Sequence, residues 1–389
     1  MATYKSPGVF VEDISIFPPS VAEVATAVPA FIGYTEKATK IDDGDLSLTP
    51  TKISSFAEYE QYFGGARNEP IVAEVVDDGA GGYTLQSLTV ATVERKSQTG
   101  DPTLANLLYH AVRLYFDNGG GICYVVSVAT YADDASPDGA KLTAGLDAVG
   151  LEDEPTLLVI PEAIKLGYAA YTALSAAAIK QANDLGDRFA VLDVWQGFAG
   201  PNDDVTIPSG TEKLATANRD AWSGELKYAA AYYPYLRTTF NYALTETDAA
   251  SNADVAYAGA AAVDLVTLKT SNAAVYNFVK QSLKDYFITV PPSGAVVGVY
   301  AATDAARGVW KAPANVALSD ILEPVVKLDN LKQDDLNIDA TSGKSINAIR
   351  AFAGRGTLVW GARTLAGNDN EWRYVPVRRF FNMVEASVK

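Results

Sequence analysis

Few side chains in the sequence are suited to acid–base, nucleophilic or metal chemistry. His110 is the one histidine, so a nucleophilic triad would depend on it alone, and with Cys123 as the one cysteine a Cys/His metal site lacks ligands. His110 stands between Leu107 and Val112 at helical spacing, which predicts a structural or surface role. Cys123 lies in an apolar run, which predicts a buried thiol.

Motifs for phosphate, calcium or carboxylate chemistry are incomplete. Ser342-Gly-Lys-Ser ends like a P-loop, but Ile338 occupies the earlier glycine position, so we predict a flexible loop. Gly119-Gly-Gly follows an expected helix, the reverse of a dinucleotide fingerprint. Asp42-Asp-Gly-Asp lacks the spacing of an EF-hand loop, which predicts a solvated turn. The paired acids Asp203-Asp204 and Asp334-Asp335 fall in polar segments, which predicts solvated faces rather than a glycosidase pair. We therefore expect no catalytic residue, no metal and no cofactor.

The charge is distributed unevenly along the chain. Residues 341–389 carry eight bases and three acids, a net +5, which leaves −21 on the rest of a chain whose total is −16. A basic end on an acidic body predicts a surface for an acidic partner. The other interpretation is that these arginines pair with the chain's own acids, and the sequence leaves both open.

The length, cysteine count and net charge of the chain limit its number of domains, its cellular compartment and its partners. With 389 residues the chain can form two or three domains, and with one cysteine it can form no internal disulfide. No secretion signal and no apolar run of membrane-spanning length is visible, so we expect folding in the cytoplasm and no membrane insertion. The net charge of −16 makes nucleic acid a poor partner.

The elements that must position these residues alternate between helices and apolar strands. Uninterrupted apolar runs at 122–128, 156–160 and 188–194 predict strands buried on both faces. Apolar residues at helical spacing predict a helix that begins at Asp101-Pro102, before the first of these strands. The same spacing predicts further helices at 167–185, 272–287, 293–307 and 375–388. This order predicts an α/β fold, a mixed sheet covered by helices. Residues 56–63 predict a short helix, and residues 71–76 and 83–94 predict two strands joined by a turn.

The first thirty-five residues are extended in character. Val9, Val11 and Ile14 favour a strand, whereas Pro7 and Pro18 exclude a continuous helix. A lone strand followed by a stiff linker cannot satisfy its own edges. It must pair with a sheet of its own subunit or of a neighbour.

Several motifs resemble contractile tail sheath proteins of phages and of bacterial contractile injection systems. They occur in the order of that family; they are YKSPGVFVEDIS at 4–15, PAFIGYT at 29–35, FDNGGGICYVVSV at 116–128, RFAVLDV at 188–194, PPSGAVVGVYAATDAARGVWKAPAN at 291–315, NAIRAFAGRGTLVWGARTL at 347–365 and EWRYVPVRRFFNMVE at 371–385. The segments 36–100 and 237–288 match less well.

The resemblance implies a function and a set of partners. Sheath subunits form six-membered rings stacked helically around an inner tube, between baseplate and cap proteins, and contraction drives the tube through a target envelope. It also implies an inter-subunit strand, for which we expect Tyr4, Val9, Val11 and Ile14. By resemblance and charge, an acidic tube surface would meet Arg373, Arg378 and Arg379.

The resemblance also suggests a division of the chain. We expect an N-terminal arm at 1–20, a core from 21–35 and 101–236, a variable β-rich outer insertion at 36–100, a variable helical segment at 237–288, and a C-terminal core with the tube-facing helix at 289–389. Sheath proteins usually continue beyond the Arg-Arg-Phe helix, whereas this sequence stops at Lys389. We expect either a truncated chain or a short variant without a C-terminal arm.

Three functions remain open from sequence alone. The first is the main sheath subunit of a phage tail or phage-tail-like particle, which cells assemble and sometimes release. The second is a minor sheath paralogue, or a cap or baseplate-proximal structural protein. The third is an α/β enzyme that uses carboxylates, against which the single histidine counts.

Overall fold

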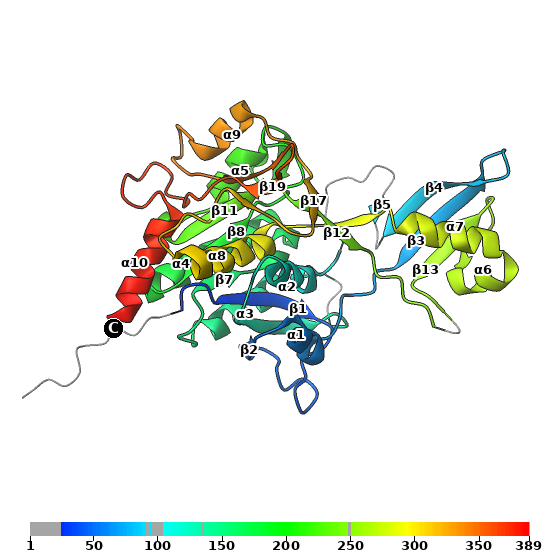
Figure 1. The fold of residues 1–389 in the computed structure, drawn as a ribbon, viewed down its shortest axis with the longest axis horizontal. Helices are drawn as coiled ribbons and strands as arrows, with labels where there is room; N and C mark the ends of the chain where they lie inside the picture. The colour runs from blue at the N-terminus through cyan, green and yellow to red at the C-terminus, as the bar shows by residue number, and fades with distance from the viewer. Residues whose placement is uncertain (1–24, 91–92, 95–103, 134–135, 248–249, 389) are drawn as a thin grey trace, which may run out of the picture.

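A nine-stranded mixed sheet forms the centre of the molecule. The computed structural model describes residues 25–90, 93–94, 104–133, 136–247 and 250–388, and the sheet has the strand order β16-β19-β18-β11-β8-β7-β1-β6-β2 (Figure 1). The bounds of its strands are β1 Pro29–Thr35, β2 Thr51–Ile53, β6 Cys123–Thr130, β7 Leu157–Val159, β8 Phe189–Asp193, β11 Ala229–Tyr233, β16 Val316–Ala317, β18 Asn347–Phe352 and β19 Gly356–Val359.

The strand directions confirm the expected mixed α/β fold. The six strands from β18 to β6 run parallel to their neighbours, and antiparallel β2, β19 and β16 lie at the two edges. Parallel strands need both faces covered, which is why the runs that contain β6, β7 and β8 are apolar throughout.

Helices cover both faces of this sheet. In β1, Phe31 packs into one core cluster with α1, α2 and α8, while the alternate residues Ala30 and Ile32 pack into a second cluster with α3, α4 and α5. The helix bounds are α1 Phe56–Phe63, α2 Leu108–Asp117, α3 Gly139–Val149, α4 Tyr168–Leu185, α5 Leu214–Ala221, α8 Ser293–Arg307, α9 Asn330–Asn337 and α10 Val375–Ser387, with 3-10 turns at Pro161–Lys165 and Leu226–Tyr228.

Helices α2 and α8 approach each other closely through two glycines. A Cβ atom on Gly294 would lie 2.4 Å from the carbonyl oxygen of Ala111, and one on Gly298 would lie 2.6 Å from that of Tyr115. Any side chain larger than hydrogen would therefore push the two helices apart. Sequence periodicity identified both helices but not this contact.

A second sheet extends to one side of the body, at the right in Figure 1. Its strand order is β14-β13-β3-β4-β5, and helices α6 and α7 accompany it. Strand β3 pairs in parallel with β13, so the expected insertion 36–100 and the expected helical segment 237–288 both contribute to this one sheet. The bounds are β3 Ile71–Asp77, β4 Tyr83–Val90, β5 Val93–Glu94, β13 Ala253–Tyr257, β14 Val263–Asp264, α6 Leu265–Ser271 and α7 Ala273–Leu283.

Two small sheets complete the strands of the described residues. One, β15-β12-β17, lies between the body and the outer sheet in Figure 1. The other is the hairpin β9–β10. The bounds are β9 Asp204–Ile207, β10 Gly210–Lys213, β12 Leu236–Asn241, β15 Phe287–Val290 and β17 Ile321–Pro324.

Two expected helix boundaries are wrong, the start of α2 and the end of α7. Helix α2 starts at Leu108 rather than near Asp101, since the buried Glu162 carboxylate accepts the N–H groups of Leu107 and Leu108 at 3.0 and 2.8 Å. Helix α8 begins at Ser293, as expected, and the Ser293 hydroxyl donates to Asp193. Helix α7 ends at Leu283 rather than near residue 287, because strand β15 begins at Phe287.

Candidate functional site

Helix α10 carries two of the three arginines that the sequence offered for contact with a tube. Arg378 is 2% exposed, and its guanidinium donates to Glu385 Oε1 at 2.7 Å and to Asn382 Oδ1 at 2.6 Å. The same group lies 4.5 Å from the ring centre of Trp372 and 4.8 Å from that of Tyr228. Arg378 is therefore held by its own helix and by two aromatic rings.

Arg379 connects three separate parts of the chain. It is 3% exposed, and its guanidinium forms a two-pronged ion pair with Asp304 of α8, at 3.1 and 2.5 Å. The same group donates to the carbonyl oxygen of Thr26 at 2.9 Å, and the Thr26 hydroxyl donates to Asp304 at 2.6 Å. The guanidinium lies 4.7 Å from the ring centre of Tyr300. This pair fixes α10 to α8 and to the segment that enters β1.

The two interpretations of the basic C-terminal segment apply to different arginines. Arg378 and Arg379 pair with the chain's own acids and are buried. Among the residues that the structure describes, no carboxylate lies within ion-pair distance of Arg350, Arg355 or Arg363, nor of the third expected tube residue, Arg373. Arg373 is half-buried, donates to Asn370 and lies over the Tyr374 ring.

The outward face of α10 is apolar, whereas the two arginines of the helix, which sequence charge placed on its surface, face inward. Tyr374, Phe381, Val384 and Val388 are 45%, 41%, 38% and 72% exposed. Their spacing of seven, three and four residues places them along one side of the helix, and we call them the α10 stripe. The separation of this stripe from Arg378 and Arg379 would have followed from a helical projection of residues 374–388.

A second exposed group lies at the hairpin between β18 and β19, and we call it the hairpin patch. Phe352 and Trp360 contact each other with ring centres 4.5 Å apart. Arg350 lies 5.3 Å from the Phe352 ring, and Arg355 lies 5.8 Å from the Trp360 ring. Neutral partners hold the arginines: Arg350 donates to Gln333 and Asn330, and Arg355 donates to Asn315.

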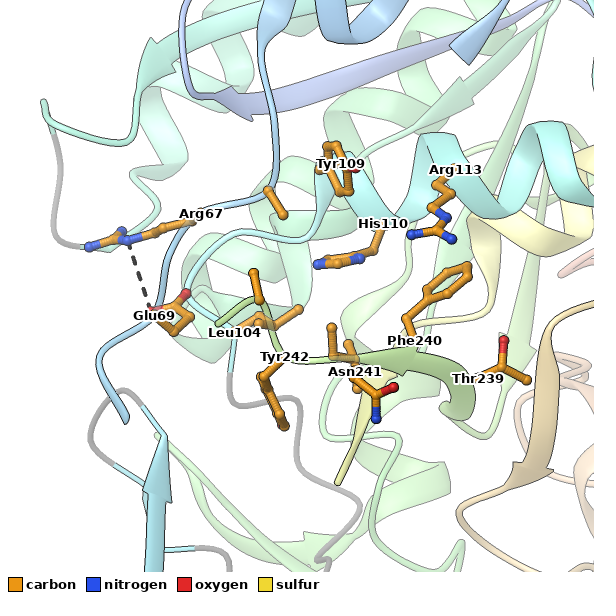
Figure 2. Close-up of a pocket in the computed structure, with 13 residues that line it drawn as sticks. Arg67, Glu69, Leu104, Tyr109, His110, Arg113, Thr239, Phe240, Asn241 and Tyr242 are labelled. Atoms are coloured by element: carbon orange, nitrogen blue, oxygen red, sulfur yellow. Dashed lines mark ion pairs between the residues drawn. The ribbon is translucent and has the colours of Figure 1, made fainter. Parts of the chain in front are cut away.

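His110 borders a cavity of about 320 Å³, which is lined by residues 66, 67 and 69 before β3 and by residues 239–243 at the end of β12 (Figure 2). His110 comes from α2 and is 5% exposed, and burial, with a smaller effect of Arg113, lowers its pKa to about 3. Arg113 in turn lies 3.9 Å from the ring centre of Phe240. The imidazole is neutral at physiological pH and contributes to core packing, which fits the structural role expected from the sequence.

The other buried titratable side chains, and the lysine of the P-loop-like segment, make contacts within the fold. Burial raises the pKa of Glu162 and of Asp193 to about 7, and each carboxyl accepts N–H groups at the start of a helix, Glu162 at α2 and Asp193 at α8. Burial also raises the pKa of the Cys123 thiol. The ammonium group of Lys344, in the P-loop-like segment, donates hydrogen bonds to the backbone carbonyls of Arg219 and Trp222, so this lysine is held against the fold.

The described part of the chain offers neither a metal site nor a membrane-spanning helix. No cluster of three or more histidine, cysteine, aspartate or glutamate residues is arranged to hold a metal ion. None of the helices in the described ranges is both long and apolar enough to cross a bilayer. The expected strand residues Tyr4, Val9, Val11 and Ile14 lie outside the described residues.

Comparisons with known proteins give a consistent result. No family model matches the chain. A tail sheath protein of Vibrio phage KVP40 is 28% identical over 136 residues, which are 33% of this chain and 20% of the phage protein. The helical sheath of the anti-feeding prophage in its contracted state is 26% identical with a TM-score of 0.56, and the match covers 99% of this chain and 75% of that one. The chain is therefore similar to contractile tail sheath proteins in both sequence and fold.

Two further solved structures, of a sheath and of a baseplate, are similar to the chain. The PVC sheath of an extracellular contractile injection system, in its contracted state, is 27% identical with a TM-score of 0.53 over 100% of this chain and 74% of that one. A chain of the anti-feeding prophage baseplate is 27% identical with a TM-score of 0.55. The curated phage sheath protein is matched over only 20% of its length.

Proposed function

We propose that this protein is a structural subunit of a contractile sheath. Its copies polymerise as stacked six-membered rings around an inner tube, and contraction drives the tube through a target envelope. The observation that carries this proposal is the fold: the match to contracted sheath subunits extends over 99–100% of the chain at 26–27% identity. The particle is a phage tail or a related injection system assembled in the cytoplasm, with baseplate and cap proteins at its ends.

The physical basis of contraction would be a difference in packing between two states of the polymer. A rigid subunit body suits this role, because rigid bodies change their mutual contacts without unfolding. The doubly covered sheet and the Arg379–Asp304 pair provide such a body. Each subunit needs to contribute little, since the difference is multiplied along the polymer.

The N-terminal arm and the tube contact are parts of this proposal. We propose that Tyr4, Val9, Val11 and Ile14 belong to a strand that pairs with a neighbouring subunit. For the tube, we retain α10 and the half-buried Arg373, and we assign the contact to the α10 stripe, because Arg378 and Arg379 are occupied inside the subunit. Arg378 and Arg379 would then act by holding the helix that presents this stripe.

Replacing Phe381 tests the assignment to the stripe. The Phe381→Asp variant puts a charge on a 41% exposed position of α10, so it should reduce the sheath recovered on tubes while leaving the fold of the subunit unchanged. Co-sedimentation of sheath with tubes measures the first effect and circular dichroism the second. The control is Leu331→Asp, at a 77% exposed position on α9. Normal sheath on tubes with Phe381→Asp would contradict the assignment.

Electron microscopy of particles from cells that express this protein with its neighbouring genes tests the proposed function. Striated sheaths in long and short forms, labelled along their length by an antibody to this chain, are the expected result. Label confined to one end would identify a minor paralogue or a cap or baseplate-proximal protein instead. Absence of any tubular particle, with the chain recovered only as a monomer, would overturn the proposal and reopen the enzyme hypothesis.

A further inference from the structure

The hairpin patch combines arginine side chains with partly exposed aromatic rings, a combination suited to binding another protein surface. Two guanidinium groups lie against two partly exposed aromatic rings, with neutral hydrogen-bond partners and no carboxylate within reach in the described residues. Arginine stacked on an aromatic ring keeps its charge and its free N–H donors. Aromatic residues and arginine are also the types that dominate protein interfaces. The patch therefore fits an acidic protein surface with an apolar component.

The same chain carries such a surface in the loop 36–50, which connects β1 to β2. Ile41 is 84% exposed, the exposed acids Asp42 and Asp43 follow it directly, and exposed Asp45 comes after Gly44. Backbone N–H groups of residues 40–42 bond the Asp45 carboxylate and lower its pKa, so the loop keeps its shape and this charge. Buried Leu46 anchors the loop to the body. We call residues 41–45 the acidic loop.

The hairpin patch and the acidic loop lie at opposite edges of the nine-stranded sheet. The patch belongs to β18 and β19, next to the edge strand β16, and the loop precedes β2, the strand at the other edge. With strands spaced about 4.8 Å apart, eight spacings separate the edges by roughly 38 Å. Figure 1 shows β19 near the top of the molecule and β2 at the bottom. The two surfaces therefore cannot meet within one subunit.

We propose that the hairpin patch of one copy binds the acidic loop of the next copy, in a head-to-tail contact. In this contact Ile41 packs on Phe352 and Trp360, while Asp42 and Asp43 pair with Arg350 and Arg355. The inference rests on the proposed function, which supplies the polymer, and adds the surface and the partner. A head-to-tail contact between two different surfaces leaves each copy one free patch and one free loop, so it builds rings or helical polymers rather than closed dimers.

Cysteine cross-linking tests the contact in assembled particles. The native Cys123 is buried, so a subunit with Ile41→Cys and Arg355→Cys presents two reactive thiols. A short bis-maleimide linker should convert this protein into a ladder of covalent multimers, because each copy carries both halves of the contact. Either single variant should give no ladder. The matched control pairs Arg355→Cys with Asp147→Cys, at an exposed position on α3, and should give none.

Charge exchange gives an independent test that does not depend on the linker. Arg355→Glu should reduce the assembled fraction about tenfold, and adding Asp43→Arg to the same chain should restore it, since the pair is then reversed. The matched control Arg307→Glu changes the net charge equally, at an exposed position on α8, and should leave assembly unchanged.

The outcomes separate this contact from the proposed function. Normal wild-type particles without a ladder from the cysteine pair would overturn the contact and leave the sheath function intact. A cross-link from position 355 to a different protein of the particle would also overturn it. If the wild-type chain forms no particles at all, the proposed function fails and the contact fails with it. A ladder together with rescue by charge exchange would support both.

Discussion

The arginines of α10 and those of the β18–β19 hairpin belong to one basic segment but have opposite surroundings. Arg379 is 3% exposed and paired with Asp304, whereas Arg355 is exposed and stacked on aromatic rings without a carboxylate partner in the described residues. The first kind of arginine stabilises the subunit, and the second is available to a neighbour. The net charge of +5 over residues 341–389 therefore does not tell which of the arginines are buried in ion pairs and which are exposed.

Removing the buried arginine should have the largest effect on the subunit. Arg379→Ala leaves Asp304 as an unpaired buried carboxylate, so we expect the free energy of unfolding to fall by about 3–5 kcal/mol. Chemical denaturation followed by tryptophan fluorescence measures this change. As a control, Arg307→Ala removes an exposed arginine of α8 and should cost less than about 0.5 kcal/mol. Equal effects of the two substitutions would contradict the distinction between buried and exposed arginines.

The two buried carboxyl groups should make the subunit less stable in alkali. Burial raises the pKa of Glu162 and Asp193 from 4.5 and 3.8 to about 7. Their protonated forms therefore favour the folded state. This contribution is complete below the ordinary pKa and is lost as pH rises through about 7.

We expect the free energy of unfolding to decrease by about 2 kcal/mol per carboxyl between pH 5 and pH 8. Unfolding at several pH values measures the slope. Asp193→Asn should flatten it, because an amide does not titrate and can still accept the N–H of Ser293. An unchanged slope in Asp193→Asn would show that Asp193 does not cause the pH dependence.

The close approach of α2 and α8 predicts a smaller loss. Gly298→Ala places a methyl group 2.6 Å from the carbonyl oxygen of Tyr115, a backbone atom that cannot rotate away. We expect a loss of about 1–3 kcal/mol, measured as a lower midpoint of denaturation. A Cβ added to Gly121 would meet no atom within 4 Å, so Gly121→Ala is the matched control and should be nearly neutral. A neutral Gly298→Ala would mean that the helices can separate without cost.

The exposed arginine should have the smallest effect on the isolated subunit. Arg355→Ala removes one hydrogen bond to Asn315 and contacts with two partly exposed rings, so we expect less than about 1 kcal/mol. Its effect should appear instead in the yield of polymer. A loss of stability as large as that of Arg379→Ala would show that the hairpin patch serves the fold rather than assembly.

Much of the fold was predictable from local patterns. The apolar runs identified β6, β7 and β8, because a strand buried on both faces is apolar throughout. Helical periodicity identified α4, α8 and α10, because an amphipathic helix repeats apolar residues every three to four positions. The start of α2 was not predictable, since Glu162, 54 residues away, bonds its first N–H groups. The outer sheet was missed as one unit because β3 and β13 pair across 182 residues, as in the register Ile71 with Ala253.

The candidate site was predictable only in part. The basic segment and its two interpretations were visible in the sequence, but the partner of Arg379 lies 75 residues earlier, on another helix. Charge counting cannot assign partners at such separations, because they depend on how α8 and α10 pack. The hairpin patch could have been suspected from Arg350, Phe352, Arg355 and Trp360, which lie within eleven residues of each other. Their contact required the antiparallel pairing of β18 with β19.

A cryo-electron microscopy map of the assembled polymer would test the distinction between the two kinds of arginine most directly. We predict that Arg379 remains paired with Asp304 inside each subunit, while Arg350 and Arg355 lie within ion-pair distance of Asp42 or Asp43 of the next copy. A map in which the hairpin patch faces solvent in both the long and the short form would contradict this account.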